Sequence, residues 1–171
     1  LSSLEKLSIS AVNVGAGGLT VDLGGSFDSL SGGSIPTFAG GPVSLSLDDV
    51  HQLHDVANVA GSALTADVQH LSDHGVSDVN LYEHLSAGDV LANESGITNL
   101  ETAIYNANLV DSHHMSLTIS DAQASALSGD VHFGGFHAGD VVVDGAHGTH
   151  LSTSLSSLEK LSISAVNVGA G

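Results

Sequence analysis

Short segments in which aliphatic and polar residues alternate recur along the chain. In most of them Val, Ile or Leu occupies every second position, and Ser, Thr, Asp or Asn stands between. This period of two is typical of a β-strand with one buried face and one polar face. The pattern predicts strands at Leu7–Val12, Leu19–Leu23, Val43–Leu47, Val79–Tyr82, Met115–Ile119, Asp140–Val143 and Leu161–Val166.

Segments with helical spacing stand between several of these strands. Asp48–Ala60 places aliphatic residues on one face and two acidic residues in its first turn, where the helix dipole favours them. The pair Thr98 and Glu101 matches a capping box. Together these signals predict helices at Asp48–Ala60, Thr65–His74, Thr98–Asn108 and Ser120–Ser128.

One segment of 17 residues occurs twice without a change. Residues 1–17 and residues 155–171 both read LSSLEKLSISAVNVGAG, so the second copy follows the first by 154 residues. Identical copies are typical of a tandem array. We therefore interpret residues 1–154 as one full repeat and residues 155–171 as the start of the next. The alternative is a single closed domain that uses a local motif twice.

A smaller unit also recurs inside the 154-residue period. Ser44–Val50 and Ser116–Ala122 have the same pattern, a strand that leads directly into a capped helix. The spacing of the predicted strands makes such units roughly 20–37 residues long, which is the size of solenoid coils. We predict an α/β repeat: a solenoid of short parallel strands alternating with helices and Gly-rich turns. A β-solenoid, or a closed α/β domain in a tandem array, is the alternative.

Glycine and proline are concentrated in one part of the chain. Gly15–Gly41 contains nine glycines, and the two prolines, Pro36 and Pro42, stand in it or beside it. Such residues favour tight turns and loops. We expect this segment to form an exposed excursion from the repeat.

The charge excludes several classes of partner. The chain has 19 acidic residues, 2 Lys or Arg, and a formal net charge of −17. It cannot neutralise phosphate, so binding to nucleic acid or to an anionic membrane is not expected. There is no Cys, and no apolar run approaches the ~18 residues of a membrane span, so we also expect no membrane insertion.

Two sets of residues have the chemistry of metal ligands. Asp22, Asp28, Asp140 and Asp144 lie near glycines in expected turns, where carboxylates and backbone carbonyls together suit Ca²⁺. Ordinary Asx-turns are the alternative. His70 and His74 stand four residues apart on a predicted helix, a spacing that can hold a transition metal. We favour solvated helix positions for this pair, because no third ligand is identifiable.

The sequence carries no signal of catalysis. A G-x-S-x-G nucleophile elbow is missing, and Lys6 and Lys160 are the two cationic side chains that could stabilise a developing negative charge. Ser, His and Asp are so abundant that a catalytic triad could be drawn almost anywhere. We therefore expect a protein that is not an enzyme.

The duplicated segment resembles a leucine-rich repeat, with apolar residues at positions 1, 4, 7, 9, 12 and 14 of residues 1–14 and 155–168. The SLTISDAQASAL unit, the acidity and the lack of Cys are similar to repeats of giant secreted bacterial adhesins and surface-fibre proteins. That resemblance implies an extracellular structural or adhesive role, secreted or at the cell surface, often with bound Ca²⁺. The expected partners are neighbouring repeats and neighbouring fibres. The alternative is an extracellular module that binds carbohydrate or metal ions through Gly15–Gly41 or the His-bearing helices.

Overall fold

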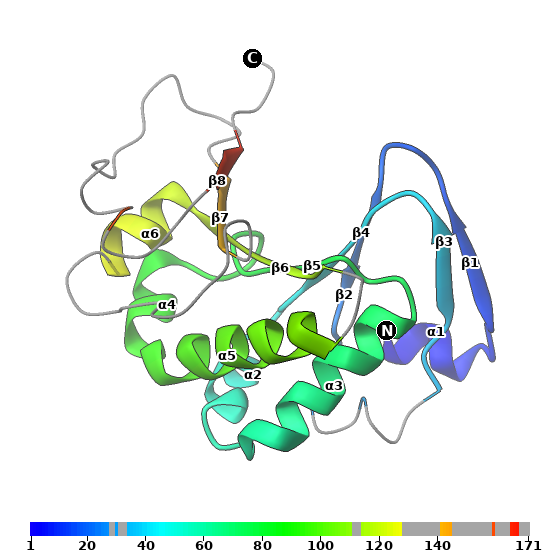
Figure 1. The fold of residues 1–171 in the computed structure, drawn as a ribbon, viewed down its shortest axis with the longest axis horizontal. Coiled ribbons are helices and arrows are strands. Elements are labelled where there is room, and N and C mark those ends of the chain that lie inside the picture. The colour runs from blue at the N-terminus through cyan, green and yellow to red at the C-terminus, as the bar shows by residue number, and fades with distance from the viewer. Residues whose placement is uncertain are drawn as a thin grey trace.

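A computed structural model of the chain describes residues 1–27, 30, 34–110, 114–127, 141–144, 159 and 165–167 (Figure 1). Its helices are α1 (Ser2–Lys6), α2 (Val50–Val56), α3 (Gly61–Asp73), α4 (Ala87–Ala92), α5 (Glu94–Val110) and α6 (Asp121–Leu127). Its strands are β1 (Ala11–Val14), β2 (Leu19–Asp22), β3 (Thr37–Gly40), β4 (Val43–Ser46), β5 (Asp78–Asn80), β6 (Ser116–Ser120), β7 (Val141–Asp144) and β8 (Ala165–Asn167).

The main sheet is parallel throughout, and its strands lie in the order in which the chain forms them. That order is β2-β4-β5-β6-β7-β8. β1 and β3 form a second parallel pair beside its first strands (Figure 1). A parallel connection needs a crossover of a dozen or more residues, usually a helix. The chain makes such crossovers with α2 and α3 between β4 and β5, with α4 and α5 between β5 and β6, and with α6 between β6 and β7. The predicted α/β class with parallel strands and helices is confirmed.

Helices α2–α6 form one layer against one face of this sheet. α3 packs on α5, α5 contacts α2 and α4, and α4 packs on α6 (Figure 1). Beneath them the strands align one aliphatic residue each, because Val21 pairs with Leu45, Leu45 with Val79, and Val79 with Leu117. Leu45, Val79 and Leu117 are fully buried. The alternation seen in the sequence therefore divides the sheet into an apolar face under the helices and a polar face opposite.

The strand predicted at Leu7–Val12 begins too early. The chain first makes the short helix α1, and Ser8 takes a positive φ of 55° before the strand begins at Ala11. Leu7 is consequently 70% exposed. The matching prediction at Leu161–Val166 overlaps β8, and residues 161–164 lie outside the described residues.

The expected exposed excursion at Gly15–Gly41 is also wrong. The segment contains β2 and β3, and it contributes Phe27, Leu30, Ile35 and Phe38 to the core, each at most 5% exposed. Gly18, whose φ is 80°, lies in the tight turn between β1 and β2. Hydrophobic residues spaced between the glycines outweighed the turn signals, because their burial stabilises the folded chain.

Several helix ends differ from the predicted ones. α3 begins at Gly61 and not at Thr65, and α5 begins at Glu94, so the Thr98 hydroxyl donates to the Glu94 carbonyl inside the helix at 2.9 Å. The predicted end of this helix, His74, agrees with the observed end of α3 at Asp73 to within one residue. Gly75 follows with a φ of 90°, and a Cβ there would lie 2.3 Å from the Phe38 carbonyl oxygen.

The short helix α4 was not predicted, although its N-terminal signal is present in the sequence. Ser86 and Asp89 form a capping box, in which the Asp89 carboxylate accepts from the Ser86 hydroxyl at 2.6 Å and from the Ser86 backbone N–H at 2.9 Å. These two hydrogen bonds, that from the hydroxyl first, lower the pKa of Asp89 from the ordinary value of an aspartate. A helix of six residues carries too little periodicity to be recognised.

Candidate functional site

The polar face of the sheet carries the densest group of interacting polar side chains in the described part of the chain. One row across four strands consists of Thr20, Ser44, Asp78 and Ser116, which are register partners in turn. The next row begins with Asp22, Ser46, Asn80 and Thr118. We call these eight residues the polar face. They lie there because each alternates with an aliphatic residue that points to the helices.

Asp78 is the centre of this face. Its Oδ1 accepts hydrogen bonds from the Ser116 hydroxyl at 2.7 Å and from the Thr118 hydroxyl at 2.6 Å, and its Oδ2 accepts from the Ser44 hydroxyl. The donors come from β4 and β6, the two strands that flank β5. Hydrogen bonds to an ionised acceptor are stronger than neutral ones. Asp78 therefore ties three strands together through side chains as well as through the backbone ladder.

The second row is more deeply buried and less completely bonded. Ser46 and Asn80 are both fully buried. The Asn80 side-chain Nδ2 donates to the Ser44 hydroxyl at 2.9 Å, but the Asn80 side-chain Oδ1 and the Ser46 hydroxyl have no hydrogen-bond partner in the described part of the chain. An unsatisfied buried polar group costs about 1–3 kcal/mol. These two atoms are therefore the places where the polar face has unused hydrogen-bonding capacity.

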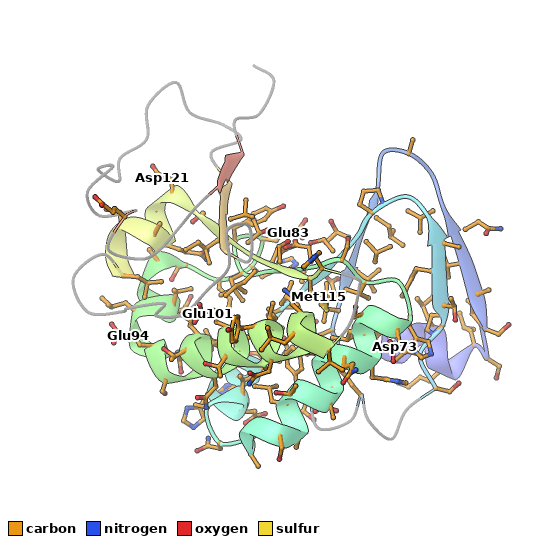
Figure 2. The ribbon with its side chains drawn as sticks, viewed as in Figure 1. Asp73, Glu83, Glu94, Glu101, Met115 and Asp121 are labelled. Carbon is orange, nitrogen blue, oxygen red and sulfur yellow. The ribbon has the colours of Figure 1, made fainter. Side chains whose placement is uncertain are left out.

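The loop after β5 extends across the polar face. The His84 imidazole Nε2 lies 3.3 Å from the Asp22 carboxylate on β2, two strands away from β5. Figure 2 shows Glu83, which precedes His84, on the side of the strands away from α3 and α5. Tyr82 lies in the same loop and is 38% exposed. The loop thus brings an aromatic ring and an imidazole to a face that is otherwise formed by hydroxyl, amide and carboxyl groups.

A cavity of ≈ 330 Å³ lies between this loop and the strands. Its lining includes Gly18, Thr20, Ser44, Asp78, Tyr82 and Thr118. An aromatic ring beside a carboxylate and several hydroxyls can stack on an apolar ring face and exchange hydrogen bonds with a polyhydroxylated ligand. None of the sequence predictions singled out Asp78 or this cavity. The signal available was the polar position of each strand, but the register that aligns those positions could not be read from one sequence.

The four carboxylates predicted to bind Ca²⁺ do not form one site. Asp22 ends β2 and pairs with His84, whereas Asp144 ends β7, four strand-to-strand steps away in the sheet. At about 4.8 Å for each step, these two residues are roughly 19 Å apart, too far to share an ion. Asp28 and Asp140 lie outside the described residues.

His70 and His74 do come together. They stand at the end of α3, with ring centroids 4.4 Å apart and planes at 60°. The His74 Nδ1 lies 2.8 Å from the His70 carbonyl oxygen, while the His70 Nε2 is buried and has no hydrogen-bond partner in the described residues. Within those residues no group of three or more His, Asp or Glu side chains could hold a metal ion. The pair therefore lacks a third protein ligand there.

Replacing Asp78 by Asn tests whether this carboxylate holds the strands together. The substitution removes the charge that three hydroxyls solvate, and we expect the free energy of unfolding to fall by about 2–3 kcal/mol. Urea unfolding measured by circular dichroism gives the value. Asp55→Asn is the matched control, because it removes the same charge from an exposed position of α2 and should change stability by about 0.5 kcal/mol or less. Equal effects of the two substitutions would contradict the role of Asp78.

No family model, curated protein or solved structure matches the chain. The likeness of its segments to leucine-rich repeats and to bacterial surface-fibre repeats thus rests on the residues of this sequence alone. Among the described residues, no helix is both long and apolar enough to cross a membrane.

Proposed function

We propose that this chain is a structural repeat of a long extracellular bacterial fibre or adhesin stalk, in which 154-residue periods follow one another as coils of a solenoid. The observation that carries the proposal is the strand order. Within the main sheet, each strand pairs in parallel with the strand of that same sheet that comes next in the sequence. Such a sheet grows in one direction as the chain proceeds. Each coil contacts only its neighbours, as in repeat proteins.

The lengths of the coils support this interpretation. Along the row of register partners that begins at Val21, Leu45 follows Val21 by 24 residues, Val79 follows Leu45 by 34, Leu117 follows Val79 by 38, and Val141 follows Leu117 by 24. At the end of the period Val143 pairs with Val166, the copy of Val12 in the duplicated segment, which follows it by 23 residues. The coil that leads from β7 into the next β1 is therefore about as long as the shortest of the others.

Two equivalent glutamines connect successive coils in the same way. The Gln52 amide on α2, after β4, donates to the Gly25 carbonyl after β2 at 2.8 Å. The Gln123 amide on α6, after β6, donates to the Leu81 and Leu85 carbonyls after β5 at 2.8 and 2.7 Å. Each side chain thus joins its own coil to the preceding one. The repeated contact supports a repeated unit, which the similarity of Ser44–Val50 and Ser116–Ala122 had suggested.

The surface chemistry agrees with an extracellular fibre. A net charge of −17 keeps copies apart at low salt, whereas cations in the medium would screen it and allow neighbouring fibres to associate side to side in a cell-surface or biofilm matrix. Bound Ca²⁺ would act in the same direction. The partners are then other repeats of the same protein, and no catalytic step is required.

A chain of three consecutive periods tests the proposal. Electron microscopy should show unbranched rods of uniform width that lengthen by about 24 Å or more with each added period, which is five strand spacings of ~4.8 Å. Chains of one and two periods serve as the length controls. Separate globular beads joined by thin linkers would contradict the solenoid.

A second function, a binding module for carbohydrate, is favoured by the cavity between Tyr82 and Asp78. Its size and its mixture of one aromatic ring with hydroxyl and carboxyl groups suit one or two sugar rings. Such a site would repeat once in every period, so weak sites could act together along a fibre.

Titration with a panel of neutral oligosaccharides, followed by NMR, tests the second function. We expect the NMR signals of Tyr82, Asp78 and Thr118 to shift when the oligosaccharide binds. Tyr82→Ala should weaken binding at least about tenfold, which corresponds to ~1.4 kcal/mol. Tyr82→Phe keeps the ring and should weaken binding little. If no oligosaccharide in the panel shifts these signals, the cavity is not a carbohydrate site.

A further inference from the structure

The two-stranded sheet has one covered edge and one open edge. The Ser10 and Val14 carbonyls accept from the Thr37 and Gly41 backbone N–H groups at 3.1 and 2.9 Å, so these residues of the β1 segment face β3. Backbone groups alternate in direction along a strand, and therefore Ala11 and Asn13 turn their N–H and C=O groups the other way. Within the described residues no strand pairs with β1 on that side.

β3 cannot accept a further strand at its outer edge. The Phe38 backbone N–H, in the middle of β3, donates to the His74 carbonyl at the end of α3 at 2.8 Å. The sheet of β1 and β3 can therefore be extended only beyond β1.

β8 has the same sequence as part of β1 but pairs with a different strand. Its residues, Ala165–Asn167, are identical to Ala11–Asn13 of β1, because both belong to the duplicated segment. β8 pairs in parallel with β7, with Val142 opposite Ala165, Val143 opposite Val166 and Asp144 opposite Asn167. One strand sequence is thus seen with β3 beside it at one place and with β7 beside it at the other.

We propose that β7 of each period pairs in parallel with β1 of the next period, so that the main sheet continues through β1 into β3. This inference rests on the proposed function, since it requires periods that follow one another. In the present chain β8 takes the place that β1 of the next period takes in the array. The strand then uses both of its edges, one for β7 and one for β3.

The outer edge of β2 is the rival partner for β7, and it is less suited to pairing. The Leu19 and Leu23 N–H groups donate to the Pro42 and Ser46 carbonyls, so Thr20 and Asp22 turn their backbone groups outward. Asp22 places an exposed carboxylate on this edge strand, and His84 lies against it. Charged side chains on an edge strand oppose pairing with another strand. β1 carries no charged residue.

The pairing can be tested between separate copies of the full chain. In the wild-type chain β8 covers β7, and we expect a monomer. The double substitution Ala165→Pro and Val166→Pro removes two consecutive strand N–H groups, one of which must face β7, so it should release β8 and open the edge of β7. The copies should then associate by strand addition, and light scattering should give about twice the mass of the monomer or more. The measurement is made at an ionic strength that shortens the Debye length to about 8 Å or less, so that repulsion between the acidic chains is screened.

Two matched single prolines identify the edge that β7 accepts. Added to the double variant, Ala11→Pro removes an outward N–H of β1 and leaves the groups that face β3, and it should abolish the association. Thr20→Pro removes the outward N–H of β2 in the same way and should leave the association unchanged. A double variant that stays monomeric would overturn the proposal, and so would association that survives Ala11→Pro. Association lost with Thr20→Pro would make β2 the partner of β7 and leave the solenoid intact.

A peptide of residues 155–171 provides a second measurement that does not depend on assembly. Labelled with a fluorophore, it should bind to the double variant, whose β7 edge is open, and at least about tenfold more weakly to the wild-type chain, whose own β8 competes as an intramolecular strand. The same peptide with proline at the positions of Ala165 and Val166 is the control and should not bind. Equal binding of the two peptides would contradict strand pairing at β7.

Discussion

Parallel pairing in chain order is the constraint on which the rest of the structure depends. Each strand must cross over before it can pair again, and the crossovers place the helices in one layer on one face. That face then has to be aliphatic, because the row through Leu45, Val79 and Leu117 is fully buried there. The polar residues that alternate with these aliphatic residues lie on the opposite face of the sheet. One sequence alternation therefore produces both the core and the candidate site.

The polar face has a structural consequence that an apolar face would not have. Asp78 accepts hydrogen bonds from three hydroxyls on its two neighbouring strands, and this geometry exists only when the strands are in register. A slip of one residue would turn the side chains of a strand to the wrong face. The buried Ser46 and Asn80 lower stability in return, because two of their polar atoms have no hydrogen-bond partner in the described residues.

The sequence was most informative where the alternation was clean. β2, β4, β5 and β6 all overlap predicted strands, because Val, Leu or Ile alternates with a polar residue in each and leaves little choice of buried face. β7 overlaps a predicted strand through its three consecutive valines. β3 was missed because its four residues, Thr37–Gly40, lie among glycines and prolines whose turn signals concealed a single buried Phe38. The duplicated segment was read as a strand from Leu7, although a helical turn and a positive φ at Ser8 delay the strand to Ala11.

The candidate site could not be predicted, for a reason of geometry. Asp78, Ser44, Ser116 and Thr118 are brought together by register across coils of unequal length, from 24 residues between Val21 and Leu45 to 38 between Val79 and Leu117. A strict repeat would have aligned these positions in the sequence, but the crossover from β2 to β4 contains the strand β3, whereas the next two crossovers contain two helices each, and this difference removes the regularity. The paired His70 and His74 were foreseen because both belong to one helical segment, where spacing alone determines proximity.

Amide hydrogen exchange at the boundary tests most directly whether the sheet continues from one period into the next. In a chain of two consecutive periods, the strand at Ala165–Asn167 would have β7 on one side and β3 of the second period on the other. We expect the amides of Ala165, Val166 and Asn167 all to exchange slowly, because each faces a neighbouring strand. Protection of alternate amides only, as in a strand with a single neighbour, would contradict it.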